Sequence, residues 1–220
     1  MLVLEGVSAT IAGIPVLRGI SATLPAEGQG GTVAVVGRNG AGKTTLLRVI
    51  MGLLPSTAGR VLLDGQDLAT VPARDRARLG IGYAPEDRVM FPTFSVEENL
   101  RFPCEVIGLP RQAVDQRLEE TLAIVPELKP MLARSGAALS GGQGKMAALG
   151  RAIMAGSRLV LLDEPFQGLA PVLAQQYSAA LQRLLLQRPQ LTVVITESNR
   201  SLLKDVAVGT MVLERGELRR

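Results

Sequence analysis

The sequence of 220 residues predicts an α/β fold, in which helices cover a mostly parallel β-sheet. The runs 32–36, 158–162 and 191–196 are apolar without polar alternation, which is typical of strands that are buried on both faces. Helical patterns lie between these runs. Because a chain of this length can build one large core, we expect a single domain over residues 1–220.

Other strands are shorter or half-exposed, and we expect some of them to form an antiparallel layer on one side of the core. The candidates for this layer are residues 2–4, 16–24 and 60–63. Further strands are predicted at 80–84 and, near the end of the chain, at 206–213.

Helix start signals define most of the remaining chain. Two capping boxes are predicted, at Ser95 with Glu98 and at Ser140 with Gln143. In a capping box, the side chain of a Ser and that of a Glu or Gln three residues later each accept a hydrogen bond from the other residue's backbone N–H. The stretch from about 86 to 150 has no strong strand, so we interpret it as a helical subdomain inserted into the α/β core. Other helices are predicted at 43–53, from Pro72 to Leu79 and from Pro171 to about Arg188. One more helix is predicted because four apolar residues share one helical face: Val114, Leu118, Leu122 and Val125.

Composition excludes several kinds of chemistry. The chain has no His, which excludes His-based metal sites, zinc chemistry and Ser–His hydrolysis. Its single cysteine, Cys104, cannot form a disulfide within the chain, which fits a reducing cytosol. The net charge of +4 comes with scattered Arg residues and no run of like charges, so we expect ordinary surface and no nucleic-acid partner. No run approaches the ~18–20 apolar residues of a membrane span, and no signal peptide is visible.

A glycine-rich loop lies between the run 32–36 and the next predicted helix. It matches the pattern G-x-x-x-x-G-K-[ST], with Gly37, Gly42, Lys43 and Thr44 at the fixed positions. Glycines let backbone N–H groups turn around an oxyanion, and the helix directs its positive end at the phosphates. A glycine-rich turn that binds nothing is the alternative, but the strand–loop–helix context favours a phosphate-binding loop and hence a P-loop NTPase core of the RecA-like type. The candidate ATP-binding residues of this loop are Gly37, Arg38, Asn39, Gly40, Ala41, Gly42, Lys43, Thr44 and Thr45.

Two carboxylates follow the apolar run 158–162. Ligands of open parallel sheets bind beyond the carboxyl ends of the strands, so Asp163 and Glu164 are expected beside the phosphate loop. Asp163 would orient Mg²⁺ through water, Thr44 would ligate the ion, and Glu164 would be the general base that polarises the attacking water. Lys43 would contact the β- and γ-phosphates. The alternative is a pair of acidic residues in a solvated loop or a helix cap.

The segment LSGGQ at 139–143 is the most informative motif. Together with the phosphate loop and the pair of carboxylates, it resembles the ABC transporter ATPase family over essentially the whole chain. In that family two ATPase domains pair head to tail, and the signature of one closes over the ATP of the other. Ser140 could instead cap only its own helix, and both roles are compatible. The resemblance implies that the residues binding a neighbour's ATP are Ser140, Gly141, Gly142 and Gln143.

Two further segments narrow the resemblance. Residues 80–100 and 163–171 are similar to the cassettes of importers for branched-chain amino acids and of their urea and short-amide relatives. The similarity includes Glu86, which stands at the glutamine-loop position and is the third candidate metal-binding residue beside Thr44 and Asp163. It implies an ATP-binding and ATP-hydrolysing subunit of such an importer, with ATP and Mg²⁺ as cofactors.

The resemblance also implies partners and a location. The partners are transmembrane permease subunits and a second ATPase subunit, either an identical copy or a paralogue. The location is the cytoplasmic face of the inner (plasma) membrane, as a peripheral protein. In the family, the region of Phe91, Pro92 and Phe94 lines a groove for a short permease helix. The alternative is that both Phe residues fill the small core of the helical subdomain.

Three positions depart from the common pattern of the family. Ile11 stands where most members have an aromatic residue that stacks on adenine, Ser198 stands where most have a switch His, and Ala170 replaces the Asp of the D-loop. Ser198 can hydrogen-bond a γ-phosphate but cannot become cationic, and we name it with Glu164 as a catalytic candidate. We therefore expect slow ATP turnover. A weakly hydrolysing ABC module outside solute import is the alternative function, whereas a small-molecule kinase has no use for LSGGQ or for Glu164.

Overall fold

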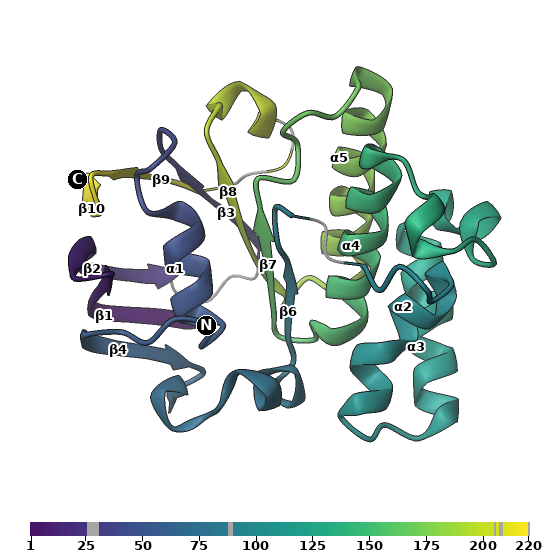
Figure 1. Ribbon diagram of the computed structural model, residues 1–220, viewed down its shortest axis with the longest axis horizontal. Helices are drawn as coiled ribbons and strands as arrows, with labels where there is room; N and C mark the ends of the chain where they lie inside the picture. Colours follow the sequence, from purple (N-terminus) through teal and green to yellow (C-terminus); the bar gives the residue numbers. More distant parts are fainter. Residues whose placement is uncertain (26–30, 88–89, 205, 207–208, 220) are drawn as a thin grey trace.

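The computed structural model describes residues 1–25, 31–87, 90–204, 206 and 209–219. The elements lie in layers, as Figure 1 shows: an antiparallel sheet, then a central sheet, then a group of helices on the far side of the central sheet. Helix α1 (Lys43–Ile50) lies between the two sheets. The predicted α/β fold, with a mostly parallel sheet and an antiparallel layer, is confirmed.

The central sheet brings the carboxyl ends of three strands to one edge. Within the described residues its order is β10-β9-β3-β8-β7-β6, and every neighbouring pair is parallel except β9 with β10. Val36 of β3 pairs with Glu197 of β8, and Asp163 of β7 pairs with Thr196 of β8. These strands therefore end side by side, at the edge where open parallel sheets bind ligands. The strands are β3 (Gly31–Val36), β6 (Ile81–Ala84), β7 (Leu159–Asp163), β8 (Thr192–Glu197), β9 (Gly209–Glu214) and β10 (Glu217–Arg219).

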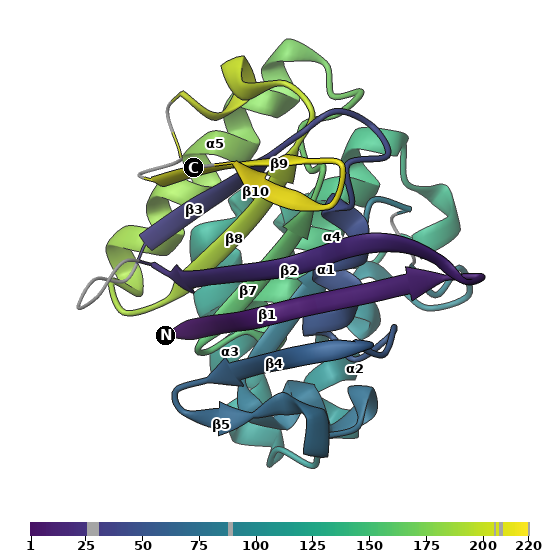
Figure 2. The ribbon, with the colours of Figure 1, turned by 90° about the vertical axis from the view of Figure 1, so that its left-hand side faces the viewer.

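The second sheet is antiparallel and covers α1 from the other side. Its order is β2-β1-β4-β5, and Figure 2 shows it in front of the rest of the molecule. Along β1, buried residues such as Leu2 and Leu4 are separated by more exposed ones, as expected for a sheet with one face toward water. The strands are β1 (Leu2–Ile11), β2 (Ile14–Leu24), β4 (Ala58–Leu63) and β5 (Gln66–Asp67).

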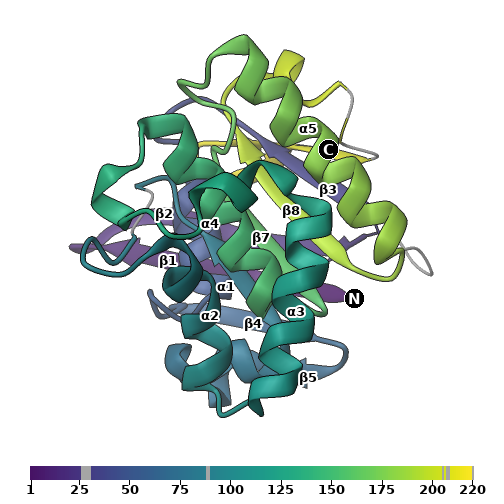
Figure 3. The same cartoon turned by 90° about the vertical axis from the view of Figure 1, so that its right-hand side faces the viewer.

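Longer helices cover the opposite face of the central sheet, as Figure 3 shows. Gly82 of β6 lets α4 approach closely, because a Cβ at this position would lie 1.9 Å from the carbonyl oxygen of Ala152. These helices are α2 (Val96–Val106), α3 (Arg111–Ile124), α4 (Gly141–Ala155) and α5 (Pro171–Gln187). Short 3₁₀ segments join the elements at Leu68–Thr70, Ala73–Leu79, Pro126–Met131, Gly136–Ala138 and Arg200–Leu203.

The central sheet separates two hydrophobic cores. On one face, Leu161 of β7 belongs to a cluster with α1 and the antiparallel sheet. On the other face, Leu162 belongs to a cluster with the covering helices. Both side chains are fully buried, so β7 buries its two faces and its sequence needs no polar alternation.

The predicted helix starts are confirmed where a capping box marks them. Ser95 caps α2 and Ser140 caps α4, each with both reciprocal hydrogen bonds. Helix α1 ends at Ile50, short of the predicted residue 53, because Gly52 adopts a left-handed φ of 68°.

Other element boundaries differ from the predictions. Strand β1 continues well past residue 4, because polar side chains on its outer face interrupt the apolar pattern. The segment predicted as a short helix through Leu79 is a 3₁₀ helix. Strands β5 and β10 were not predicted, since two or three residues are too short to show a period. Part of the predicted strand 206–213 lies outside the described residues, and the described β9 ends at Glu214.

We expect Leu161→Ala to lower the free energy of unfolding by about 2–5 kcal/mol, because it removes buried methyl groups and leaves a cavity between the sheets. Leu186→Ala is the matched control, since Leu186 is 83% exposed on α5 and should change stability by less than about 0.5 kcal/mol. Urea unfolding of both variants measures the difference. Equal effects would contradict the two-sided burial of β7.

Candidate active site

The phosphate loop predicted from the sequence connects β3 to α1, and its geometry requires glycine at two positions. A Cβ on Gly37 would lie 2.3 Å from the carbonyl oxygen of Leu213 in β9. Gly42 precedes α1 with a left-handed φ of 108°. The N–H of Ala41 donates to the carbonyl of Arg38 at 3.0 Å and closes the loop.

Free backbone donors lie at the end of this loop. In the described part of the chain, no hydrogen bond is formed by the N–H groups of Gly42, Lys43 or Thr44, as expected for the first turn of a helix. The positive end of α1 adds to their field. Together they make an anion-binding site beside a cavity of about 230 Å³. The cavity is lined by Val16, Asn39, Gly40, Gly42, Lys43, Thr44, Thr45, Glu86, Glu164 and Gln167.

Lys43 is buried inside the loop and pairs with a carboxylate from the central sheet. Its Nζ lies 2.9 Å from Oε1 of Glu164, and both side chains are nearly inaccessible to solvent. Nζ also donates to the carbonyls of Gly37 at 2.7 Å and Arg38 at 3.2 Å. A phosphate group that enters the loop must therefore take Lys43 away from partners within the chain.

Asp163, the last residue of β7, is held by hydroxyl groups from three elements. Thr196 donates to its Oδ1 at 2.7 Å, Thr44 donates to the same oxygen at 3.1 Å, and the Tyr83 hydroxyl lies 3.4 Å from Oδ2. Burial raises the pKa of the Asp163 carboxyl, while the hydrogen bonds from Thr196 and Thr44 oppose that rise. The adjacent oxygens of Thr44 and Asp163 form a hard donor set that suits a magnesium ion bound with phosphates.

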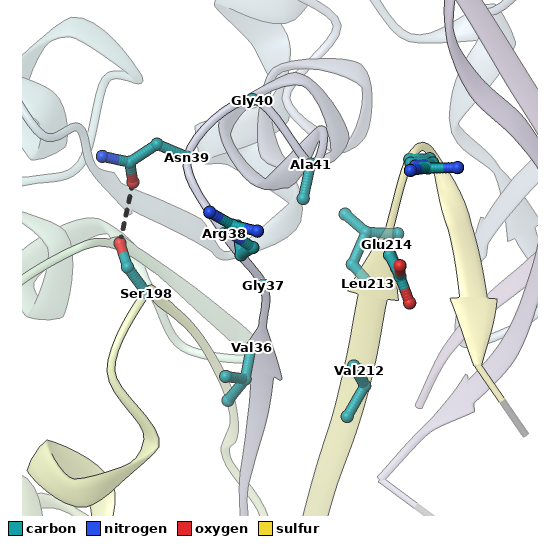
Figure 4. Close-up of a pocket in the computed structure, with 11 residues that line it drawn as sticks. Val36, Gly37, Arg38, Asn39, Gly40, Ala41, Ser198, Val212, Leu213 and Glu214 are labelled. Carbon is teal, nitrogen blue, oxygen red and sulfur yellow. Dashed lines mark hydrogen bonds between the residues drawn. The ribbon is translucent and has the colours of Figure 1, made fainter.

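Glu164 follows directly and has a left-handed φ of 44°, which is uncommon for a residue other than glycine. The Ser198 hydroxyl lies 2.8 Å from its Oε2 and 3.0 Å from Oδ1 of Asn39. The latter contact is drawn in Figure 4, which looks into a second cavity of about 670 Å³ between the phosphate loop and the end of β9. In the orientation that satisfies its amide, Gln167 donates to Glu164 Oε2 at 3.1 Å and to Glu86 Oε1 at 3.0 Å.

Glu86 lies at the rim of the smaller cavity and is exposed. Partial desolvation, followed by the charges of Glu164 and Asp163, raises the pKa of the Glu86 carboxyl. No hydrogen bond joins Glu86 to Thr44 or Asp163 among the residues that the structure describes, and no group of three or more Asp, Glu, Cys or His side chains there is arranged to hold a metal ion. Two of the three predicted metal ligands are thus adjacent, and the third stands apart.

The signature residues lie away from their own phosphate loop. Ser140 and Gly141 are exposed at the start of α4, and none of the four signature candidates, Gly142 and Gln143 included, lines either cavity beside the loop. Ser140 accepts from the N–H of Gln143 at 3.4 Å, and the Gln143 side chain accepts from the N–H of Ser140 at 3.0 Å. Within one chain, Ser140 therefore caps its own helix.

Ile11, the position predicted to face adenine, lies at the end of β1 and is 45% exposed. It lines neither cavity, whereas Val16 of β2 lines the smaller one. The place of Ile11 beside adenine stays a prediction.

Several site residues were missed in the sequence. Thr196 and Tyr83 hold Asp163, and Gln167 lies between two carboxylates. Lys145 of α4 donates from Nζ to the carbonyls of Glu164 at 2.7 Å and Gln167 at 2.8 Å. One available signal was a polar residue at the end of an apolar run, as in LTVVITE at 191–197.

Glu197 ends that run and is the more deeply buried of the two charged groups that were missed, Lys145 being the other. It is 1% exposed, and its Oε1 accepts from the N–H of Phe166 at 2.8 Å. Burial is the main cause that raises the pKa of the Glu197 carboxyl to about 7, and the charge of Glu164 adds to it.

A comparison with protein families matches residues 17–167 to the family described as ABC transporter. The high-affinity branched-chain amino acid transport ATP-binding protein BraG of Pseudomonas aeruginosa is 33% identical over 86% of this chain and 80% of its own length. The Fe(3+) ions import ATP-binding protein FbpC of Pseudomonas fluorescens is 38% identical over 98% of this chain and 59% of its own length. The lipopolysaccharide export system ATP-binding protein LptB of Escherichia coli is 32% identical over 78% of this chain and 70% of its own.

Solved structures resemble the whole chain. An ATP-binding subunit of an ABC transporter superposes with a TM-score of 0.85 and 25% identity, over 100% of this chain and 88% of that one. A dimeric bacterial ABC transporter cassette also gives a TM-score of 0.85, with 22% identity over 100% of this chain and 97% of that one. The second likeness shows the fold alone.

We expect the stability of the protein to fall as pH rises from about 5 to about 8, with Glu197 as a cause. The folded-state pKa of about 7 exceeds the ordinary value of 4.5, so the folded state binds more protons than the unfolded state between these values. Glu197→Gln removes this contribution, and its stability relative to the parent should rise by up to about 3 kcal/mol over that range. Urea unfolding at several pH values measures it. Parallel pH profiles for the two proteins would contradict the assignment.

Proposed function

The chain belongs to the ABC transporter family, and on this premise we propose that it is the ATP-hydrolysing subunit of an importer for branched-chain amino acids or related small amides. ATP-binding cassettes of this family hydrolyse ATP, so the chain is an ATPase. The observation that carries the proposal is the convergence of Lys43, Asp163 and Glu164 at one edge of the central sheet. The choice of substrate is supported by relatives named for branched-chain amino acid transport, while others are named for iron import and lipopolysaccharide export.

The phosphate loop binds the triphosphate in this proposal. The free N–H groups of Gly42, Lys43 and Thr44 receive phosphate oxygens, and the Lys43 ammonium moves from Glu164 to the β- and γ-phosphates. Thr44 and Asp163 would hold Mg²⁺, which would neutralise charge on the phosphates, and Glu86 at the rim of the same cavity would be the third ligand. Thr45 donates to the α-phosphate.

Glu164 accepts a proton from the attacking water. Once Lys43 pairs with phosphate, one oxygen of Glu164 loses its cation and becomes available as a base. Ser198 fixes the other oxygen from 2.8 Å and supplies no positive charge to the transferring phosphoryl group. The missing charge favours slow turnover, and it also supports the second candidate function, a weakly hydrolysing ABC module outside solute import.

The signature completes a neighbouring site. Because Ser140 and Gly141 are exposed at the positive end of α4, they can receive the γ-phosphate of ATP that is bound to a second copy or a paralogue. The functional unit in this proposal is therefore a head-to-tail dimer. We further propose that residues 1–220 act as one ATPase domain, with about 86–150 as its helical subdomain.

The permease is proposed to dock in a groove of about 660 Å³ between β6, α1 and α2. Leu53 and Val106 in this groove are 58% and 55% exposed. Phe91 lines the groove and also packs against Phe94, in a tilted arrangement, and against Phe102, edge to face, with ring centroids 5.1 and 4.7 Å away. Phe91 therefore belongs both to the groove and to a small aromatic core.

The charge of this groove favours a permease segment with an acidic residue. Arg48, Arg74 and Arg151 line it against the single carboxylate of Asp87. Among the described residues, Arg151 has no ion pair or hydrogen bond, and burial lowers its pKa. A carboxylate on the docked segment would compensate this cation.

No helix in the described ranges is long and apolar enough to cross a bilayer. The proposed location is the cytoplasmic face of the inner membrane, where the permease holds the subunit.

We expect Glu164→Gln to abolish ATP turnover and to accumulate an ATP-bound dimer, because the amide cannot accept the proton of water. Glu119→Gln, an exposed change on α3, is the control and should behave like the parent. Steady-state ATP hydrolysis and gel filtration with ATP measure the two effects. Parent-like hydrolysis by Glu164→Gln would reject the role of this residue.

For docking, Val106→Asp places a charge among apolar groove residues and should reduce copurification with the permease subunits at least about tenfold. The isolated variant should hydrolyse ATP as the parent does. Leu186→Asp is the matched control, because Leu186 is equally apolar and lies outside the groove. Loss of the complex with both variants, or with neither, would reject the groove as the docking site.

A further inference from the structure

We propose that Lys145 and Glu197 are positioning residues that hold the turn carrying Glu164, and that Lys145 ties this turn to the signature helix α4. The proposal rests on the role of Glu164 in the proposed function. It assigns a task to two charged side chains that make no direct contact with the phosphate-binding cavity.

The turn that follows β7 needs to be held. Glu164 occupies a left-handed conformation that a residue with a side chain adopts only when its surroundings impose it. The N–H of Glu164 donates to the carbonyl of Thr196 at 3.1 Å, which fixes the start of the turn to β8. The remaining groups of the turn have no ladder of sheet hydrogen bonds to rely on.

Lys145 supplies the first clamp, from α4. Its single ammonium donates to the carbonyl of Glu164 at 2.7 Å and to the carbonyl of Gln167 at 2.8 Å. These two oxygens lie at opposite ends of the turn, so one cation sets the distance between them. Hydrogen bonds from a charged donor are the strong ones, and Lys145 is partly shielded from water.

Glu197 supplies the second clamp, from β8. Its Oε1 accepts from the N–H of Phe166 at 2.8 Å, in the middle of the same turn. The Phe166 ring in turn packs edge-on against Tyr177 of α5, with ring centroids 5.3 Å apart. A buried carboxylate and a cation thus hold the turn from two different elements.

The clamp from α4 connects two active sites. Lys145 lies five residues after Ser140 in the same helix, whose start is proposed to bind the neighbour's nucleotide. A displacement of α4 would move the carbonyl of Glu164 with it. Engagement of the signature and placement of the base at the chain's own nucleotide are therefore linked through one side chain.

The test uses ATP hydrolysis by the full chain. We expect Lys145→Met and Glu197→Leu each to lower kcat about 10- to 100-fold while the KM for ATP changes less than about threefold, because a misplaced base slows chemistry more than binding. Lys145→Arg and Glu197→Gln should recover most of the lost kcat, since they restore two donors and one acceptor. Lys129→Met, an exposed lysine outside α4, is the control and should match the parent.

A second measurement separates positioning from folding. In the Glu164→Gln background, adding Lys145→Met should leave the amount of ATP-bound dimer unchanged, because Lys145 does not line the phosphate-binding cavity and acts only on the main chain of the turn. A parent-like kcat for Lys145→Met, or loss of the ATP-bound dimer together with a raised KM, would overturn the inference. Continued hydrolysis by Glu164→Gln alone would instead reject the proposed role of Glu164.

Discussion

The buried ion pair between Lys43 and Glu164 is the interaction around which the site is arranged. It exists because parallel strands β3, β8 and β7 end in register, which brings the phosphate loop and the acidic turn to the same edge of the sheet. Two charges with so little contact to water must be compensated, and here each compensates the other. In the proposed mechanism a triphosphate replaces Glu164 as the partner of Lys43, so binding of the substrate also frees the proposed base.

When Lys43 changes its partner from Glu164 to a phosphate, other contacts must keep the two carboxylates in place. Hydroxyl groups hold Asp163, and Ser198 and Gln167 hold Oε2 of Glu164, so we expect both carboxylates to keep their places when Lys43 changes partner. The main chain below Glu164 is secured by Lys145 and Glu197 from two further elements. In the proposed site few side chains contact the substrate, and more residues hold those side chains in place.

The sequence was sufficient for the parts of the fold and site that depend on local chemistry. The phosphate loop was predictable because a left-handed Gly42 and a Lys at the helix start are needed wherever such a loop forms, and both capping boxes were found for the same reason. Lys145 and Glu197 were missed because their partners are main-chain groups 19 and 31 residues away, which no spacing rule relates. The predicted strand at 2–4 was too short because the solvent face of β1 is polar. The role proposed for the signature requires a second chain, which no pattern within this sequence supplies.

The division of the hydrophobic interior by the central sheet has an evolutionary consequence. One core supports α1 and the phosphate loop, and the other supports α2 and α4, which line the groove together with Arg48 of α1. Substitutions among the covering helices can accumulate without repacking the layer under the nucleotide. Such modularity would let the helical side of the groove vary while the layer that carries the phosphate loop keeps its packing.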